Sequence, residues 1–526
     1  MECGVTGGGH GLRTGFLCYP TPLPVPVNRT WASLEAFTNQ RKYRTVQRLG
    51  LLLGGLIFVL LLVIPAPAGL SIEGWRTVAV AVLMATWWMT EAIPIPATAI
   101  LPLGLFPTLG VLDVESASTP YANEIIFLFM GGFFLAFTMQ KWGLHKRIAL
   151  AIVSFVGTGP AQLVLGFMLA TAFLSMWISN TATTAMMLPI ALAVGEMFRP
   201  QSQERSYNFG VALMLGVAYA ASIGGVSTLI GTPPNVVLAG AARELLGVEI
   251  GFVQWMGVGV PVALVLLPLT WIILTRFLYP PGDLAGDAIE VIEAERRALG
   301  VPSKGEKLTA VVFVLTTLAW VFRSEKTIGG VTIVGLQTLV PNLRDSTVAM
   351  LAAATLFILP VDWKKGEFAL DWKTAGRIPW GVLVLFGGGL SLARAMAQSG
   401  LTEWIGRGVV SLHVVPVLLI IAAVVTLVVF LTELTSNVAT TAMAMPVMAG
   451  AAVGLSMEPL LLMAVAALAG SMAFMLPVAT PPNAIVFGSG YITIPQMSRA
   501  GFFLNLGAIV VVAGLGSILI PFFLLN

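Results

Sequence analysis

Long stretches without Asp, Glu, Lys or Arg alternate along this chain with short charged segments. The charge-free stretches cover 50–72, 92–112, 148–195, 206–242, 250–275, 408–432, 434–457, 459–498 and 500–526. A helix needs about 20 apolar residues to cross a hydrocarbon core of about 30 Å, so each stretch can hold one or two crossings. The stretches are apolar on every face and do not alternate with period two, which favours helices over a transmembrane barrel. The pattern predicts an all-α polytopic membrane protein with about 10 to 12 crossings.

The composition agrees with a membrane protein and excludes several other classes. Of the 526 residues, 57% are hydrophobic and 10% are charged, whereas soluble domains carry about 25% charge. The only cysteines, Cys3 and Cys18, lie in the N-terminal segment, and His10, His145 and His413 are too scattered for a histidine metal site. A net charge of +3 does not indicate a nucleic-acid partner. Because HExxH, GxSxG and paired intramembrane carboxylates are absent from the sequence, we expect no enzyme activity.

The charged segments divide the chain into four regions. We expect a disordered cytoplasmic leader over 1–46, a first repeat over 47–277, a cytoplasmic linker over 278–307 and a second repeat over 308–526. Arg41, Lys42, Arg44 and Arg48 precede the first span, so the positive-inside rule predicts a cytoplasmic N-terminus. The expected location is the inner (plasma) membrane of the cell, with the lipid bilayer as the surrounding partner.

Internal repetition is the most informative feature of the sequence. The run Ser179-Asn180-Thr181-Ala182-Thr183-Thr184 recurs 257 residues later as Ser436-Asn437-Val438-Ala439-Thr440-Thr441. Phe129-Met130-Gly131-Gly132 recurs at the same spacing as Phe386-Gly387-Gly388-Gly389. Thr232-Pro233-Pro234-Asn235 recurs 248 residues later as Thr480-Pro481-Pro482-Asn483. Ordered matches at nearly one spacing predict a duplicated half.

The repeated motifs place polar and helix-breaking residues inside apolar stretches. Unwound backbone is tolerated at membrane depth only where it is buried or lines a cavity, and broken helices at matching places mark the site of a secondary transporter. Helix N-termini at such breaks suit an anion. Freed carbonyls, hydroxyls and amide oxygens are hard ligands that suit Na⁺. The alternative is that these polar residues only join neighbouring helices, but two copies in register favour a site.

The paired motifs resemble the divalent anion:sodium symporter family, which carries dicarboxylates, citrate or sulfate. Further matching positions are Ser471, Phe474, Pro477, Val478, Ala479, Asn483, Ile485 and Val486, while Gly470 departs from the family pattern. The resemblance spans about residues 50–526. It implies a homodimer of eleven-helix protomers, each built from an inverted internal repeat. Each protomer would have a scaffold, a mobile transport domain and two re-entrant hairpins, and would work by an elevator mechanism. It also implies hairpin tips near Gly131-Gly132 and Gly387-Gly388-Gly389, and broken helices that carry Asn180 and Asn437.

The resemblance also implies which residues form the site. The Na⁺ ligands would be Ser175, Ser179, Asn180 and Gly231 in the first half, and Thr432, Asn437 and Ala479 in the second. The carboxylate substrate would contact Ser179, Asn180, Thr181, Thr232, Ser436, Asn437, Thr480 and Pro481. The spacing from Ser175 to Ser179, like that from Thr432 to Ser436, is four residues, which puts both members of each pair on one helix face.

Three questions stay open from the sequence. We expect Na⁺ symport of a di- or tricarboxylate, first of all a C4-dicarboxylate such as succinate. Val438 lacks the hydroxyl of its counterpart Thr181, so citrate or sulfate remains an alternative substrate, and anion exchange remains an alternative to symport. Glu433 is the one acid in this zone; it either binds a proton or orients a cation site, or it is a structural carboxylate hydrogen-bonded to the hairpin.

Overall fold

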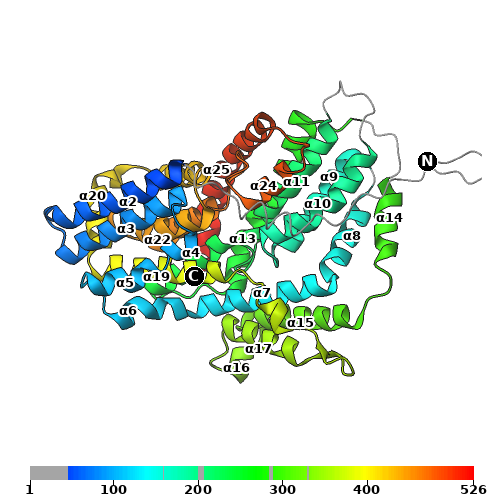
Figure 1. Ribbon diagram of the computed structural model, residues 1–526, viewed down its shortest axis with the longest axis horizontal. Coiled ribbons are helices and arrows are strands. Elements are labelled where there is room, and N and C mark those ends of the chain that lie inside the picture. Colours follow the sequence, from blue (N-terminus) through cyan, green and yellow to red (C-terminus); the bar gives the residue numbers. More distant parts are fainter. Residues whose placement is uncertain (1–44, 158, 199–206, 283–287, 329–330, 526) are drawn as a thin grey trace, which may run out of the picture. The chain divides into compact units, whose positions relative to one another are not determined.

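The computed structural model describes residues 45–157, 159–198, 207–282, 288–328 and 331–525. The leader prediction therefore lies almost wholly outside the described residues. In the first half the elements are α2 (Thr45–Val63), α3 (Ile72–Thr90), α4 (Ile95–Thr98), α5 (Leu101–Thr108), α6 (Val114–Ser118), the 3₁₀-helix η1 (Thr119–Ala122), α7 (Glu124–Trp142), α8 (Leu144–Val156), α9 (Pro160–Ser175), α10 (Asn180–Met197), α11 (Asn208–Gly225), α12 (Pro233–Leu246), α13 (Phe252–Ile272) and the π-helix η2 (Ile273–Leu278) (Figure 1).

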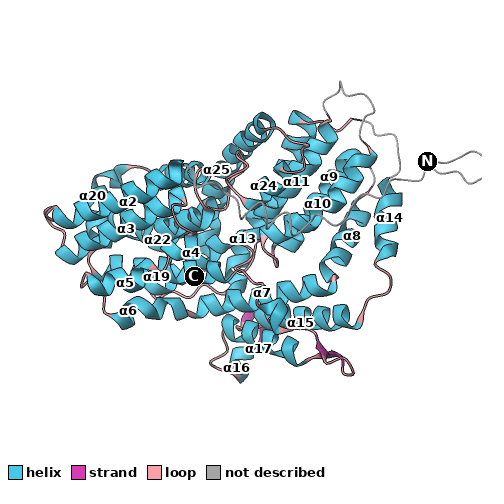
Figure 2. Ribbon diagram, viewed as in Figure 1, coloured by secondary structure: helices cyan, strands magenta, loops and turns pink. Residues whose placement is uncertain are grey.

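The second half of the described chain begins within the predicted linker, because α14 and the first residues of α15 lie inside 278–307. Its elements are α14 (Ala288–Ala298), α15 (Lys304–Val321), β1 (Lys326–Ile328), β2 (Val331–Ile333), α16 (Leu336–Leu339), α17 (Asp345–Ile358), β3 (Pro360–Asp362), β4 (Glu367–Phe368), α18 (Trp372–Ala375), α19 (Trp380–Gln398), α20 (Leu401–Val409), η3 (Val410–Val414), α21 (Val417–Thr432), α22 (Asn437–Gly454), α23 (Pro459–Ala469), α24 (Pro481–Phe487) and α25 (Ile494–Leu524). The described strands form two short antiparallel hairpins, β1–β2 and β3–β4 (Figure 2). The prediction of an all-α membrane fold is confirmed.

The described residues contain seven helices that are long and apolar enough to cross a membrane. Five shorter apolar helices accompany them, over 95–108, 160–175, 345–358, 417–432 and 459–469. Two of the short helices, α9 and α21, each precede one Ser-Asn motif and are too short to cross a bilayer as straight helices. The predicted count of about eleven crossings therefore mixes full spans with segments that turn back.

The duplication is visible in the element bounds. Helices α9 and α10 map onto α21 and α22 residue for residue at the 257-residue spacing, and α7 maps onto α19 to within one residue. Helices α12 and α24 both begin with Pro-Pro-Asn, 248 residues apart, although α24 is shorter. The two halves therefore repeat in structure as well as in sequence.

Helices α9 and α10 form a hairpin whose tip carries the first Ser-Asn motif. Ala172 near the end of α9 lies against Gly224, and Met168 lies against Gly216, so α9 runs parallel to α11. Asn180 at the start of α10 lies against Gly225, while the hydroxyl of Tyr207, just before α11, donates to Gly195 O near the end of α10. Helix α10 thus returns antiparallel to α11, and the three helices lie side by side (Figure 1).

The second Ser-Asn motif lies at the tip of an equivalent hairpin. Helices α21 and α22 both pack along α23, and Thr432 and Thr441 both lie beside Gly470 at the end of α23. The expectation that Asn180 and Asn437 lie in broken helices is therefore wrong. The broken helices are α11–α12 and α23–α24, which are interrupted over 226–232 and 470–480, just before each Pro-Pro-Asn.

The repeated glycines do not form hairpin tips, contrary to the expectation from the sequence. Helix α7 is continuous through Gly131-Gly132, and α19 is continuous through Gly387-Gly388-Gly389. A Cβ atom on Gly131 would lie 2.7 Å from Ala349 Cβ, and one on Gly388 would lie 2.3 Å from Ala99 O. These glycines allow close helix packing, which in membranes replaces the missing hydrophobic driving force.

Replacing Gly388 with Ala tests this packing role. The added Cβ has no room at Ala99, and overpacking of this kind costs about 1–3 kcal/mol. The matched control is Gly104→Ala, because Gly104 is also helical but has no atom within 4 Å of the added Cβ. Thermal unfolding of the purified protein should show a lower midpoint for G388A only. Equal midpoints for the two variants would contradict the packing role.

Candidate functional site

The first Ser-Asn motif brings one end of the Asn180 side-chain amide against three other oxygen atoms. Asn180 Oδ1 lies 2.7 Å from Ser175 Oγ, 3.1 Å from Ala221 O and 3.3 Å from Gly231 O. With the amide turned over, its nitrogen would donate to the same three oxygens. With the oxygen in this place, the four oxygens form the kind of ligand set that a hard cation prefers. The donor set therefore fits Na⁺ only when the amide oxygen, and not the amide nitrogen, faces the other three oxygens.

The backbone around this cluster requires glycine. A Cβ atom on Gly231 would lie 2.3 Å from Gly225 O and 2.9 Å from Ser175 O. Both carbonyls therefore lie directly beside Gly231, which no larger residue could replace without moving the backbone. The structure brings the predicted ligands Ser175, Asn180 and Gly231 together, although their binding of Na⁺ stays a prediction.

The second half repeats the arrangement at equivalent positions. Thr432 is fully buried, and its Oγ1 donates to Asn437 Oδ1 at 2.8 Å and to Gly470 O at 3.2 Å. The backbone oxygen hydrogen-bonded to Thr432 is thus that of Gly470, not that of the predicted ligand Ala479. The pair Thr432–Asn437 corresponds to Ser175–Asn180 at the 257-residue spacing, so the cluster is duplicated with the fold.

Four helices begin at the repeated motifs. Ser179 caps α10 by accepting from Ala182 N at 3.4 Å, and Thr480 caps α24 by accepting from Asn483 N at 3.2 Å. Ser436 and Thr232 precede α22 and α12 without a side-chain capping bond. Helix α10 packs against α24, and α12 packs against α22. Each Ser-Asn helix therefore contacts the Pro-Pro-Asn helix of the other half, and free N–H groups at these N-termini suit an anion.

The predicted substrate residues differ in exposure. Thr232 and Thr480 are buried, with 2% and 3% of their surface exposed. The half-buried members are Ser179, Asn180, Ser436 and Asn437, and the exposed members are Thr181 and Pro481. The motif residues thus extend from buried to exposed positions.

Glu433 holds the unwound segment of the second broken helix. Its carboxylate accepts from the backbone N–H of Phe474 at 2.6 Å, of Met475 at 2.9 Å and of Leu476 at 3.2 Å, and from Asn505 Nδ2 at 2.8 Å. Only 3% of the residue is exposed. These bonds are those expected of a structural carboxylate, here joining the tip of the hairpin to 474–476 and to α25.

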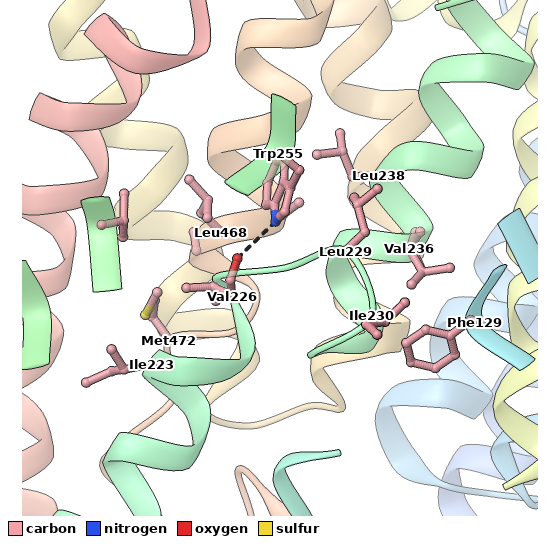
Figure 3. Packing of buried hydrophobic residues seen from close by; sticks show 14 of the residues in the cluster. Phe129, Ile223, Val226, Leu229, Ile230, Val236, Leu238, Trp255, Leu468 and Met472 are labelled. Carbon is pink, nitrogen blue, oxygen red and sulfur yellow. Dashed lines mark hydrogen bonds between the residues drawn. The ribbon is translucent and has the colours of Figure 1, made fainter. Parts of the chain in front are cut away.

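The first half satisfies the corresponding segment without a carboxylate. The position equivalent to Glu433 is Met176, whose carbonyl accepts from the Thr228 hydroxyl. The indole of Trp255 donates from Nε1 to Val226 O at 2.9 Å, within a packed group of buried apolar side chains (Figure 3). The two repeats therefore hold equivalent unwound segments with different chemistry.

Sequence reasoning missed Asn505, which is fully buried and lies 72 residues from its partner Glu433. The available signal was an amide beyond the first turn of the apolar helix α25, since intramembrane polar residues usually pair with one another. The hydrophobic periodicity of the sequence could not have identified Glu433 as the partner of Asn505.

A helical membrane protein with two hairpins, two broken helices and duplicated polar clusters at their tips has the architecture of a secondary transporter. Comparison with known protein families identifies the family to which the chain belongs. The chain belongs to the family described as the sodium:sulfate symporter transmembrane region, whose model matches residues 45–525. The family is one of transporters, in agreement with the expectation of no enzyme activity.

Similar proteins are known from staphylococci. A protein from Staphylococcus saprophyticus named sodium-dependent dicarboxylate transporter SdcS is 42% identical over 499 residues, which cover 93% of this chain and 95% of the relative. A Staphylococcus aureus protein of the same name is 41% identical over 490 residues, which cover 91% of this chain and 93% of the relative. The similarity thus extends over nearly the full length of each protein.

Two solved structures share the fold at low sequence identity. The Alcanivorax borkumensis YdaH transporter has a TM-score of 0.59 and 15% identity, covering 86% of this chain and 98% of its own. Neisseria gonorrhoeae MtrF has a TM-score of 0.52 and 13% identity, covering 91% of this chain and 97% of its own. Both support the fold alone.

The variant Glu433→Gln tests the carboxylate contacts. One amide nitrogen would then face backbone N–H groups, and each buried donor left without an acceptor costs about 1–3 kcal/mol. We expect a lower unfolding midpoint and a reduced Hill coefficient for Na⁺ in transport. Glu458→Gln is the control, since Glu458 is exposed and makes no side-chain bond at the start of α23. Unchanged stability and cooperativity in E433Q would disprove the structural role.

Proposed function

We propose that this protein imports a C4-dicarboxylate such as succinate together with Na⁺. The observation that carries the proposal is the duplicated oxygen cluster, Ser175 with Asn180 and Thr432 with Asn437, at the tips of two hairpins. The names of the staphylococcal relatives support both the ion and the substrate class. Citrate or sulfate as substrate, and anion exchange as mechanism, are the alternatives that the experiments below separate.

Electrostatics explains why two cation sites are useful. Moving one charge against 100 mV costs about 2.3 kcal/mol, so a dianion that enters a negative cell costs about 4.6 kcal/mol. Two Na⁺ ions cancel this cost, and their concentration gradient then supplies the driving force. Two equivalent clusters match that minimum.

The substrate would lie between the N-termini of the motif helices. Thr232 and Ser436 make no capping bond, so their hydroxyls are available to a carboxylate, whereas Ser179 and Thr480 already cap α10 and α24. Asn180, Asn437 and the adjacent peptide N–H groups complete the proposed contacts, with Thr181 and Pro481 at the exposed edge. Because Val438 replaces a second threonine, the protein would offer one hydroxyl fewer to one end of the substrate than to the other.

Radiolabelled uptake into proteoliposomes tests the proposed function. Because two clusters would each bind one cation, we expect succinate uptake to require external Na⁺ with a Hill coefficient above one. Citrate and sulfate should compete weakly. Uptake that proceeds equally well in choline, but only with substrate inside the vesicles, would instead establish exchange.

We also propose an elevator mechanism in a homodimer of the plasma membrane, with the N-terminus in the cytoplasm. Helices α9–α13 and α21–α25 contact one another across the two halves and would move together against α7, α17 and α19. At this boundary α12 packs on α19 through Gly240 and Leu390, and Glu244 forms a two-bond ion pair with Arg394. Movement would require these contacts to separate.

A disulfide across this boundary tests the movement. A Cβ atom on Gly240 would lie 3.0 Å from Leu390 Cδ1, so Gly240→Cys with Leu390→Cys should cross-link after Cys3 and Cys18 are replaced by Ser. We expect oxidation to lower the rate of uptake at least tenfold and reduction to restore it. The control pair is Gly257→Cys with Phe523→Cys, which joins α13 to α25 within the moving group. Full transport by the oxidised boundary pair would contradict an elevator.

A further inference from the structure

The asparagine that ends each Thr-Pro-Pro-Asn motif is fully buried and faces its own unwound segment. Asn235 Nδ2 donates to Thr228 O at 2.8 Å, to Val226 O at 3.2 Å and to Gly225 O at 3.4 Å. Each acceptor lies in or beside the break between α11 and α12. The side chain therefore reaches back across the break and holds the carbonyls that the missing helical turns leave free.

The second half reproduces these bonds at the same relative positions. Asn483 is fully buried, and its Nδ2 donates to Leu476 O at 3.1 Å and to Ala473 O at 3.3 Å. Leu476 and Ala473 lie 248 residues after Thr228 and Gly225, which is also the spacing of the two asparagines. The same residue thus performs the same task in both repeats.

Each asparagine also carries a buried acceptor without a partner among the described residues, namely Asn235 Oδ1 and Asn483 Oδ1. Turning either amide over would bring its oxygen against the carbonyls it now contacts, so the orientation is determined by the bonds. Buried polar atoms are nearly always paired, and an exception calls for an explanation. In both repeats the unpaired atom is the side-chain oxygen of the equivalent asparagine, although an unpaired buried oxygen lowers stability.

The acceptors of Asn235 connect it to the first oxygen cluster. Gly225 lies between the Asn180 amide and Gly231, since a Cβ on Gly225 would lie 2.3 Å from Asn180 Oδ1 and one on Gly231 would lie 2.3 Å from Gly225 O. Asn235 thus determines where the backbone beside Asn180 lies.

In the second half, Asn483 holds the carbonyl side of the segment whose N–H groups are bound by Glu433. Glu433 directly follows Thr432 of the second cluster. The second asparagine is thus linked to its cluster through the shared segment 473–476.

We propose that Asn235 and Asn483 are positioning residues that set the size, and hence the ion selectivity, of the two cation sites. This inference rests on the proposed function, because it presumes that the clusters bind Na⁺. Removing the amide would release the backbone of 225–228 and of 473–476, against which the cluster residues are held. A cage whose oxygens are held less firmly discriminates less well between ions of different radius.

The test measures cation affinity and selectivity in Asn235→Ala and Asn483→Ala. The readouts are the Na⁺ concentration for half-maximal succinate uptake, the ratio of uptake in Na⁺ to uptake in Li⁺, and the Na⁺-induced rise in unfolding temperature without succinate. We expect at least a tenfold higher half-maximal Na⁺ concentration and a several-fold lower Na⁺ to Li⁺ ratio, with maximal uptake per folded protein nearly unchanged. Asn208→Ala is the control, since Asn208 makes one exposed bond to Pro280 O.

The outcomes separate the two proposals. A wild-type protein without Na⁺-induced stabilisation and without Na⁺-dependent uptake would refute the proposed function itself. Wild-type Na⁺ dependence, together with unchanged affinity and selectivity in the folded variants, would refute the positioning role and leave the asparagines purely structural. If an alanine variant does not accumulate, Asn235→Leu and Asn483→Leu serve the same test, because leucine is close to asparagine in shape and has no side-chain donor. Unchanged Na⁺ affinity and selectivity would again overturn the inference.

Discussion

The constraint on which the rest of this structure depends is that unwound backbone inside a membrane must find hydrogen-bond partners within the protein. Two helices are interrupted, at 226–232 and at 470–480. The interruptions free carbonyl and N–H groups, which make the segments chemically useful. The interruptions also cost stability, because each buried polar group without a partner destabilises the folded protein by about 1–3 kcal/mol. Side chains that satisfy part of each segment therefore determine which atoms remain available to solutes.

The two repeats satisfy their unwound segments partly with the same residue type and partly with different residues. Asn235 and Asn483 bind equivalent carbonyls in both halves. In the first half Trp255 adds a second bond to Val226 O, and the Thr228 hydroxyl accepts from Gly231 N. In the second half Glu433, with Asn505 behind it, accepts from the N–H groups of the segment. A duplicated fold thus carries a carboxylate on one side only, and the two clusters, though alike in geometry, lie in different electrostatic surroundings.

The glycine repeats show where sequence reasoning about motifs fails. Gly-Gly inside an apolar segment indicates either a turn or a close helix contact, and both occur in membrane proteins. The distinction depends on what lies opposite the glycine, here Ala349 for Gly131 and Ala99 for Gly388. Those neighbours lie far away in the chain, so the local pattern could not decide between the two interpretations.

The sequence by itself determined the membrane class, the helical fold, the duplication and the residue types of the candidate site, because hydrophobic length and motif spacing are local properties of the chain. Tertiary structure alone decided that the Ser-Asn motifs lie at hairpin tips and that the breaks precede Pro-Pro-Asn. It also decided that α10 meets α24 while α12 meets α22. Tertiary structure also decided that Asn505 is the side-chain partner of Glu433. These features depend on contacts between segments tens to hundreds of residues apart, and such contacts form only when the helices pack and their buried polar groups find acceptors.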